Sequence, residues 1–230
     1  MSVFVTGTDT GCGKTYISSA ILRALAGDGL RVVGMKPVAT GAEIIDGQLR
    51  NDDVDQLAAA SNVAVAETAR NAYLFEPPAS PHIAAAAAGV VITTKTIIRA
   101  YHECAAAADF VVVEGVGGWQ VPLCETETVG GLAAALELPV LLVVGIKLGC
   151  INHGLLSAGA ISASSAPLCG WIANVLEPDL YALDAVVATL EARISAPLLG
   201  VVGWQDDSPA QGAARQLAAD LLHPDRVHGS

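Results

Sequence analysis

The sequence predicts an α/β fold with a doubly wound, mostly parallel β-sheet and helices on both of its faces. Apolar segments of strand length alternate with helical patterns along the chain, which is typical of βαβ units. Several segments are apolar at successive positions, as in strands buried on both faces of a parallel sheet. The expected strands are residues 3–6, 31–35, 110–114, 139–146, 169–174 and 198–202. The expected helices are residues 16–26, 94–107, 128–136, 151–162 and 180–194.

Length and linker content favour one domain. The 230 residues are enough to bury a substantial core, and no repeat or long linker divides them. Pro77, Pro78 and Pro81 indicate a loop within the domain and not a boundary between two. We therefore expect a single domain over residues 1–230.

Composition and charge exclude several classes of protein. Although 53% of the residues are hydrophobic, no apolar run reaches the ~18 residues that a transmembrane helix needs. The first residues lack the basic segment of a signal peptide, so we expect a cytoplasmic protein with no membrane partner. The five cysteines are odd in number and lack metal-type spacing, which favours reduced thiols. A net charge of −11 argues against a nucleic-acid partner.

The most informative stretch is residues 7–15, Gly-Thr-Asp-Thr-Gly-Cys-Gly-Lys-Thr, between the first strand and the first helix. Such a turn presents backbone N–H groups and the positive end of a helix dipole to a polyphosphate. Lys14 would reach the β- and γ-phosphates, and the Thr15 hydroxyl would hold Mg²⁺. The strict P-loop pattern has four residues between its first glycine and Gly-Lys, and the fifth residue here makes the loop a variant. An ordinary glycine-rich turn is the alternative, but the strand, glycines, Gly-Lys-Thr and helix occur in the P-loop order.

Ligands of such sheets bind at the carboxyl ends of the strands. Lys36 follows the second strand, and Pro37 biases it toward an extended conformation. This segment alone favours a solvated surface lysine over a site residue. Residues 147–153 also run from a strand end into a helix start, which is a further candidate anion site.

Two acidic segments are candidate metal ligands. Asp52, Asp53 and Asp55 open a short helix, where carboxylates most often complement the dipole. Glu114 ends the third strand, as does the second metal-holding carboxylate of P-loop enzymes. A buried Glu114 without a partner would be costly, which favours the metal interpretation. Glycines at 115, 117 and 118 would let the backbone approach a ligand closely.

Six motifs follow one another along the chain: Gly-Thr-Asp-Thr-x-x-Gly-Lys-Thr, Lys-Pro-Val-Ala-Thr-Gly, Arg-Asn-x-Asp, Ser-Pro-His, Val-Glu-Gly-x-Gly-Gly-Trp and Lys-Leu-Gly-Cys-Ile-Asn-His. Taken together, they resemble dethiobiotin synthetase, an ATP-dependent carboxylase family. Their order and spacing, and not any single motif, carry the resemblance, which spans nearly the whole chain. The family's P-loop shares the five-residue gap.

The resemblance implies a P-loop NTPase-like homodimer that converts 7,8-diaminononanoate, CO₂ or bicarbonate, and MgATP to dethiobiotin, ADP and phosphate. This is the penultimate step of biotin biosynthesis. One amine captures CO₂ as a carbamate, whose oxygen attacks the γ-phosphate to give a carbamic-phosphoric anhydride. The second amine then closes the ureido ring.

The resemblance also implies site residues. Lys36, Lys14 and Thr10 would be catalytic, and Thr15, Asp53 and Glu114 would bind Mg²⁺. The nucleotide would contact, besides these metal ligands, Gly11, Cys12, Gly13, Lys14, Tyr16, Gly115, Val116, Gly117, Asn174, Gly203, Trp204 and Gln205. The diamine would contact Thr40, Gly117, Gly118 and Trp119, and its carboxylate would bind Gly149, Cys150, Ile151, Asn152 and His153 of the neighbouring subunit.

Some positions depart from the family pattern, and other classes remain as alternatives. Gly11 replaces an acidic residue of some relatives, and residues 203–205 differ from the family's Pro-Trp-Leu. An ATP switch of the partitioning and targeting class is the first alternative, but Asp9 stands where those proteins carry a signature lysine. A related ATP-dependent ligase of the amidating kind would need a glutaminase domain with a nucleophilic cysteine, for which this chain has no room.

Overall fold

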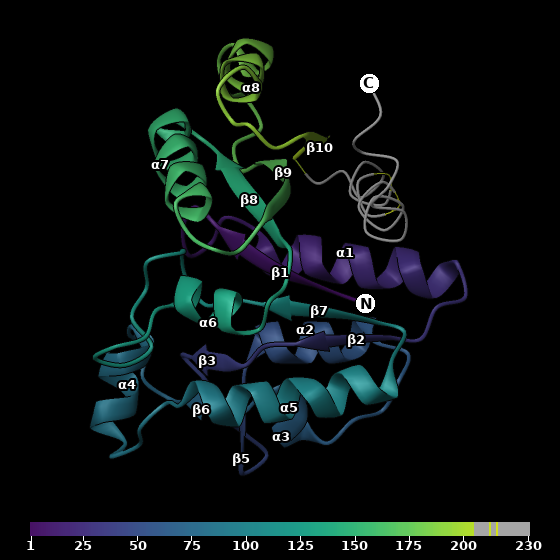
Figure 1. Cartoon of the computed structure of the whole chain (residues 1–230), viewed down its shortest axis with the longest axis vertical. Helices are drawn as coiled ribbons and strands as arrows, with labels where there is room; N and C mark the ends of the chain where they lie inside the picture. Colours follow the sequence, from purple (N-terminus) through teal and green to yellow (C-terminus); the bar gives the residue numbers. More distant parts are fainter. Residues whose placement is uncertain (205–211, 213–214, 216–230) are drawn as a thin grey trace.

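The computed structural model describes residues 1–204, 212 and 215, and its centre is a six-stranded parallel sheet (Figure 1). The strand order is β10-β9-β8-β1-β7-β2. The strands are β1 (Ser2–Gly7), β2 (Val32–Met35), β7 (Phe110–Glu114), β8 (Val140–Ile146), β9 (Leu168–Val175) and β10 (Leu198–Val202). All five pairings between them are parallel, so their carboxyl ends share one edge. The six strands match the six expected from the sequence.

Helices cover both faces of the sheet. Helices α1 (Lys14–Gly27) and α2 (Asp52–Ala60) pack on one face through Ile17, Ile21 and Leu57. Helices α5 (Thr94–Ala107), α6 (Val129–Ala135), α7 (Cys150–Ser162) and α8 (Leu183–Glu191) belong to the core of the other face. The doubly wound α/β fold expected from the sequence is thereby confirmed.

Strand β1 shows why the strands are apolar at successive positions. Val3 and Val5 belong to the core cluster beneath α1, whereas Phe4 belongs to the cluster on the opposite face. All three side chains are fully buried. Alternate residues therefore supply two separate cores, one on each face of the sheet.

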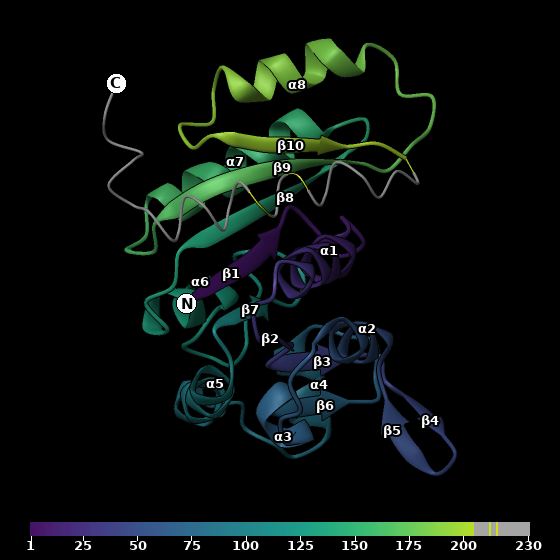
Figure 2. The same cartoon turned by 90° about the vertical axis from the view of Figure 1, so that its right-hand side faces the viewer.

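The segment between β2 and β7 contains most of the structure that the sequence did not predict. Strands β3 (Val38–Thr40) and β6 (Tyr73–Phe75) form a small parallel sheet, and β4 (Glu43–Ile45) and β5 (Gln48–Arg50) form a hairpin. The hairpin projects from the rest of the molecule in Figure 2. Helices α3 (Glu67–Arg70) and α4 (Pro81–Ala87) complete this segment.

Two expected boundaries differ from the structure. The last expected helix, residues 180–194, is limited to Leu183–Glu191, because Ala182 at its N-cap has a left-handed φ of 56°. Pro81 does not stay in a loop but occupies the first turn of α4, where its missing N–H is not needed. None of the helices in the described ranges is long and apolar enough to cross a membrane.

Candidate functional site

The turn between β1 and α1 has the backbone geometry of a phosphate-binding loop. Helix α1 begins at Lys14, so the N–H groups of its first turn have no partners inside the helix. Gly13 caps the helix with φ 91°, a left-handed conformation that favours glycine. A Cβ at Gly13 would also lie 2.1 Å from the Asn174 amide nitrogen. Asn174 in turn donates to the Cys12 carbonyl at 2.9 Å, which fixes the loop from β9.

Lys14 is folded back on the loop. Its side chain is buried, and Nζ donates to the Asp9 carbonyl oxygen at 2.8 Å. Burial is the main cause that lowers the pKa of Lys14. Nζ also donates to Cys12 Sγ at 3.9 Å. Neither partner carries a full negative charge, so this poorly solvated ammonium gains strongly from a polyphosphate.

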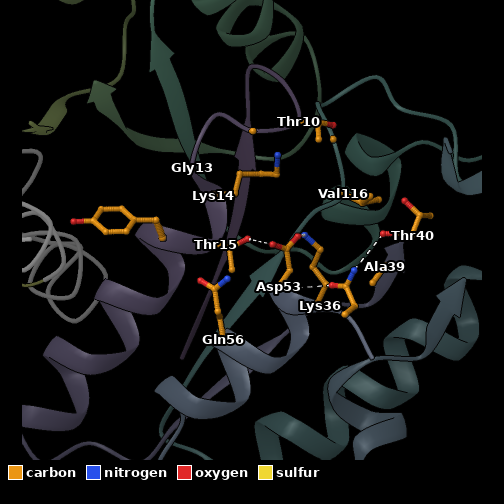
Figure 3. A pocket seen from close by; sticks show the side chains of 14 residues that line it. Thr10, Gly13, Lys14, Thr15, Lys36, Ala39, Thr40, Asp53, Gln56 and Val116 are labelled. Atoms are coloured by element: carbon orange, nitrogen blue, oxygen red, sulfur yellow. Dashed lines mark hydrogen bonds and ion pairs between the residues drawn. The ribbon is translucent and has the colours of Figure 1, made fainter. Parts of the chain in front are cut away.

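Four side chains from four segments converge beside this loop, namely Thr15, Lys36, Asp53 and Glu114, of which Figure 3 shows the first three. Lys36 Nζ lies 2.7 Å from Asp53 Oδ2 and 2.5 Å from Glu114 Oε1. Thr15 Oγ1 lies 2.8 Å from both Asp53 Oδ1 and Glu114 Oε1. The residues come from the ends of β2 and β7 and from the first turns of α1 and α2.

Burial and the neighbouring charges shift the pKa values of this cluster in opposite directions. Burial disfavours the ammonium of Lys36, but Glu114 and Asp53 outweigh it and raise the pKa of Lys36. Burial likewise disfavours the Asp53 carboxylate, but the charge of Lys36 and its hydrogen bond lower the pKa of Asp53. Lys36 and Asp53 are therefore both charged at neutral pH. The solvated surface lysine that the 36–41 segment alone favours is wrong, since the Lys36 side chain is only 4% exposed.

Backbone contacts that the sequence did not reveal hold Lys36 and Asp53 in place. The Lys36 N–H donates to the Arg70 carbonyl at 2.9 Å, and Asn71 Nδ2 donates to the Lys36 carbonyl at 2.6 Å. Asn51 caps α2 by accepting from the Asp53 N–H, and its amide donates to the Thr40 carbonyl. An asparagine one residue before an acidic helix start is a recognisable N-cap signal.

The oxygen atoms of the cluster fit a hard divalent cation. The single proton of Thr15 can satisfy only one of its two carboxylate neighbours at a time. Glu114 Oε2 is buried, and no hydrogen-bond partner for it exists in residues 1–204. In octahedral Mg²⁺ coordination, neighbouring ligand oxygens lie about 2.9 Å apart, close to the 2.8 Å of the Thr15 contacts. Because the described ranges hold no group of three or more His, Cys, Asp or Glu suited to a metal, Mg²⁺ would also need phosphate oxygens.

A cavity of about 380 Å³ joins the loop to this cluster. Its lining includes many of the expected site residues, namely Thr10, Gly11, Gly13, Lys14, Thr15, Tyr16, Lys36, Thr40, Asp53, Val116 and Gly117. It also includes three residues that the sequence did not single out, Ala39, Asn51 and Gln56. Gln56 lies three residues after Asp53 on α2, a spacing that places both on one helix face.

The other expected site residues do not line this cavity. Cys12 is buried behind the loop, and the Trp119 side chain is buried against Gly130. Glu114 is the last residue of β7, Gly115 follows it, and Gly118 lies against the backbone of Gly7. Trp204 is 48% exposed just after β10, next to Gly203, and Gln205 lies outside the described residues.

The expected carboxylate-binding segment is at the start of another helix. Gly149 is the N-cap of α7, with a left-handed φ of 93°, and α7 begins at Cys150. Asn152 and His153 are exposed, Ile151 is half-buried, and none of these residues lines the cavity beside the loop. Within one chain, residues 149–153 do not contact the cluster of Thr15, Lys36, Asp53 and Glu114. Their expected role therefore depends on a second subunit.

The fold and loop together define the class, an α/β protein of the P-loop NTPase type. A family model described as an AAA domain matches residues 1–211. The chain therefore belongs to this AAA-domain family, which includes dethiobiotin synthetase.

Solved structures of P-loop proteins are similar to the chain in fold. The MinD cell division protein of Aquifex aeolicus, in its complex with MinC, has a TM-score of 0.58 at 14% identity, with 95% of each chain covered. MinD of Pyrococcus horikoshii, solved with Mg-ADP, gives 0.57 at 15% identity and 100% coverage of both chains. A ParA family ATPase from Chlorobium tepidum gives 0.54 at 13% identity, covering 96% of this chain and 98% of its own. At such identities the similarity shows the fold alone.

Proposed function

We propose that the protein is an ATP-dependent dethiobiotin synthetase. It would carboxylate 7,8-diaminononanoate and close the ureido ring at the expense of ATP. The observation that carries the proposal is the placement of Lys36, a buried ammonium between Asp53 and Glu114 in the same cavity as the P-loop. The family match and the order of the sequence motifs support it.

The charges of the site suit transfer of a phosphoryl group to a carbamate. Carbamate, γ-phosphate and leaving phosphate bring negative charge together, and such reactions are catalysed mainly by positioning and electrostatic stabilisation. Lys36 would keep its proton and direct its charge toward the carbamate and the transferred group. Lys14 would exchange its Asp9 contact for phosphate oxygens. Thr15, Asp53 and Glu114 would hold Mg²⁺, which would offset part of the negative charge of the phosphates.

The other binding roles are those that the resemblance to the synthetase family implies. Thr10 and the first turn of α1 would contact phosphates, and Asn174 and residues 203–205 would contact the adenine. Thr40 and the backbone of residues 117–119 would bind the diamine. In a homodimer, residues 149–153 of the second subunit would receive its carboxylate. We place the reaction in the cytoplasm.

A nucleotide-dependent switch is the second candidate, since the fold is similar to MinD and ParA family structures. Asp9 tells against it, because an exposed acidic residue occupies the loop position of the lysine that defines that class.

Phosphate release with each substrate supplied separately tests the proposal. ATP would be incubated with diamine, with bicarbonate, with both and with neither, and phosphate and dethiobiotin would be measured. A synthetase requires both substrates for phosphate release and forms dethiobiotin in equal amount. Phosphate release that is independent of the diamine, with no dethiobiotin, would contradict the proposal and favour a switch.

A further inference from the structure

Arg70, at the end of α3, is a buried cation without a counter-ion. Arg70 is only 8% exposed, and no carboxylate of the described residues lies within ion-pair distance of its guanidinium. Nη1 donates to the Gly34 carbonyl at 2.7 Å and to Ser61 Oγ at 2.9 Å. Those two bonds use both Nη1 protons and fix the plane of the guanidinium. Burial accordingly lowers the pKa of Arg70.

Arg70 lines a second cavity of about 500 Å³, together with residues of α2, α3, β5 and β6. Among the described residues, both hydrogen bonds of this guanidinium come from Nη1, which leaves Nε and Nη2 without one. They form one edge of the guanidinium, whose two parallel N–H groups match a carboxylate. Leu49, Val54 and Leu74 give the cavity an apolar wall.

The remaining charges of the cavity favour a singly charged ligand. Arg50 is paired with Asp55 at 2.8 Å, and Glu67 acts on Arg50 as a second, more distant anion. Arg70 is therefore the cation left without a carboxylate in this lining. The two acidic side chains would repel a doubly charged phosphate more strongly than a single carboxylate.

We propose that this cavity binds a small carboxylic acid with an apolar tail. The carboxylate accepts two hydrogen bonds from Nε and Nη2 of Arg70, and the tail lies on the wall of Leu49, Val54 and Leu74. The site shares only Asn51 with the P-loop cavity and goes beyond the proposed synthetase activity.

Heptanoate is a suitable probe, and calorimetry on the full-length protein without nucleotide measures its binding. We expect saturable binding at one site per chain, and at least about tenfold weaker binding of uncharged heptanamide, because a charge-assisted pair is lost. Arg70→Gln should weaken heptanoate binding by a similar factor. The double variant Arg50→Gln/Asp55→Asn, the matched control in the same cavity, removes both members of an ion pair and should leave binding within about twofold.

Two further variants keep the test decisive. Ala58→Trp fills the cavity from the exposed side of α2 and leaves Arg70 intact, so it should abolish binding even if Arg70→Gln fails to fold. Thr40→Val should not affect binding, because Thr40 belongs to the other cavity. Absence of heptanoate binding to the unmodified protein, unchanged binding to Ala58→Trp, or a loss in Thr40→Val alone would each overturn the inference. None of these results bears on dethiobiotin formation, which is measured separately.

Discussion

The neighbouring strands β2 and β7 carry an ion pair at each end, and the two pairs differ in almost every physical respect. At the amino ends, Arg31 Nη2 lies 2.6 Å from Asp109 Oδ1, with side chains 62% and 44% exposed. At the carboxyl ends, Lys36 meets Glu114 with side chains 4% and 0% exposed. The two pairs have the same separation along the sequence. Arg31 directly precedes β2 and Asp109 directly precedes β7, and Lys36 and Glu114 lie at the other ends of the same strands.

The difference in burial between the two ion pairs indicates which end of the sheet holds the functional site. An exposed pair costs little desolvation and contributes little, and salt screens it. A buried pair must overcome a large desolvation penalty, so such pairs are weak evidence for stability and occur often at functional sites. The P-loop, Lys36, Asp53 and Glu114 all lie at the carboxyl edge, which is where open α/β sheets bind ligands.

The largest expected effect is on stability at the carboxyl edge. Lys36→Met leaves the Glu114 carboxylate buried without its cation, which should lower the free energy of unfolding by about 3–5 kcal/mol at pH 7. Urea unfolding with a chelator and no nucleotide measures this change. The double variant Lys36→Met/Glu114→Gln removes both charges and should recover at least half of the loss. If Lys36→Met and Arg31→Met, at the other edge, lowered the free energy of unfolding equally, the contrast between the buried and the exposed ion pair would be contradicted.

The second-largest effect is expected on turnover, which should fall with a substitution at the carboxyl edge but not with one at the amino edge. Lys36→Ala should lower kcat of dethiobiotin formation ~10²-fold or more, because the ammonium acts on charge that develops in the transition state. ATP binding, measured with a fluorescent analogue, should change little. Arg31→Ala is the control and should retain its turnover. Near-normal turnover of Lys36→Ala would remove Lys36 from the mechanism.

A smaller effect is expected on the metal requirement. Asp53→Asn and Glu114→Gln keep the side-chain volume but remove a carboxylate, so the Mg²⁺ concentration for half-maximal activity should rise at least about tenfold. Asp52→Asn is the matched control, since Asp52 is the exposed neighbour in the same helical turn. An unchanged Mg²⁺ titration in Asp53→Asn would rule out Asp53 as a ligand.

The sequence predicted the carboxyl edge well because its signals are local. Strand ends, the Gly-Lys-Thr turn and Glu114 can be read from short segments, and the rule on strand ends brings them together. The burial of Lys36 could not be predicted from its own segment of the sequence. It depends on the Arg70 carbonyl and the Asn71 amide, which approach Lys36 from a segment more than 30 residues later.

The small sheet between β2 and β7 was missed for the same reason. Strands β3 and β6 have only three residues each, too few for a periodic pattern, and they pair residues 38–40 with residues 73–75. Their stability depends on that distant pairing. Arg70 was also missed, because an isolated arginine in a short helix gives no sign in the sequence that it is buried.

The smallest effect is expected at the amino edge and depends on pH. Hydrogen bonds from Arg31 lower the pKa of Asp109 to about 2, below its unfolded value of about 3.9. The pair therefore contributes stability above pH 4, and this contribution is lost as pH falls from about 4 through 2. Thermal melts of the protein and of Asp109→Asn should differ slightly at pH 7, less in high salt, and converge near pH 2. A difference that persists or grows at low pH would mean that Asp109 acts through packing and not through its charge.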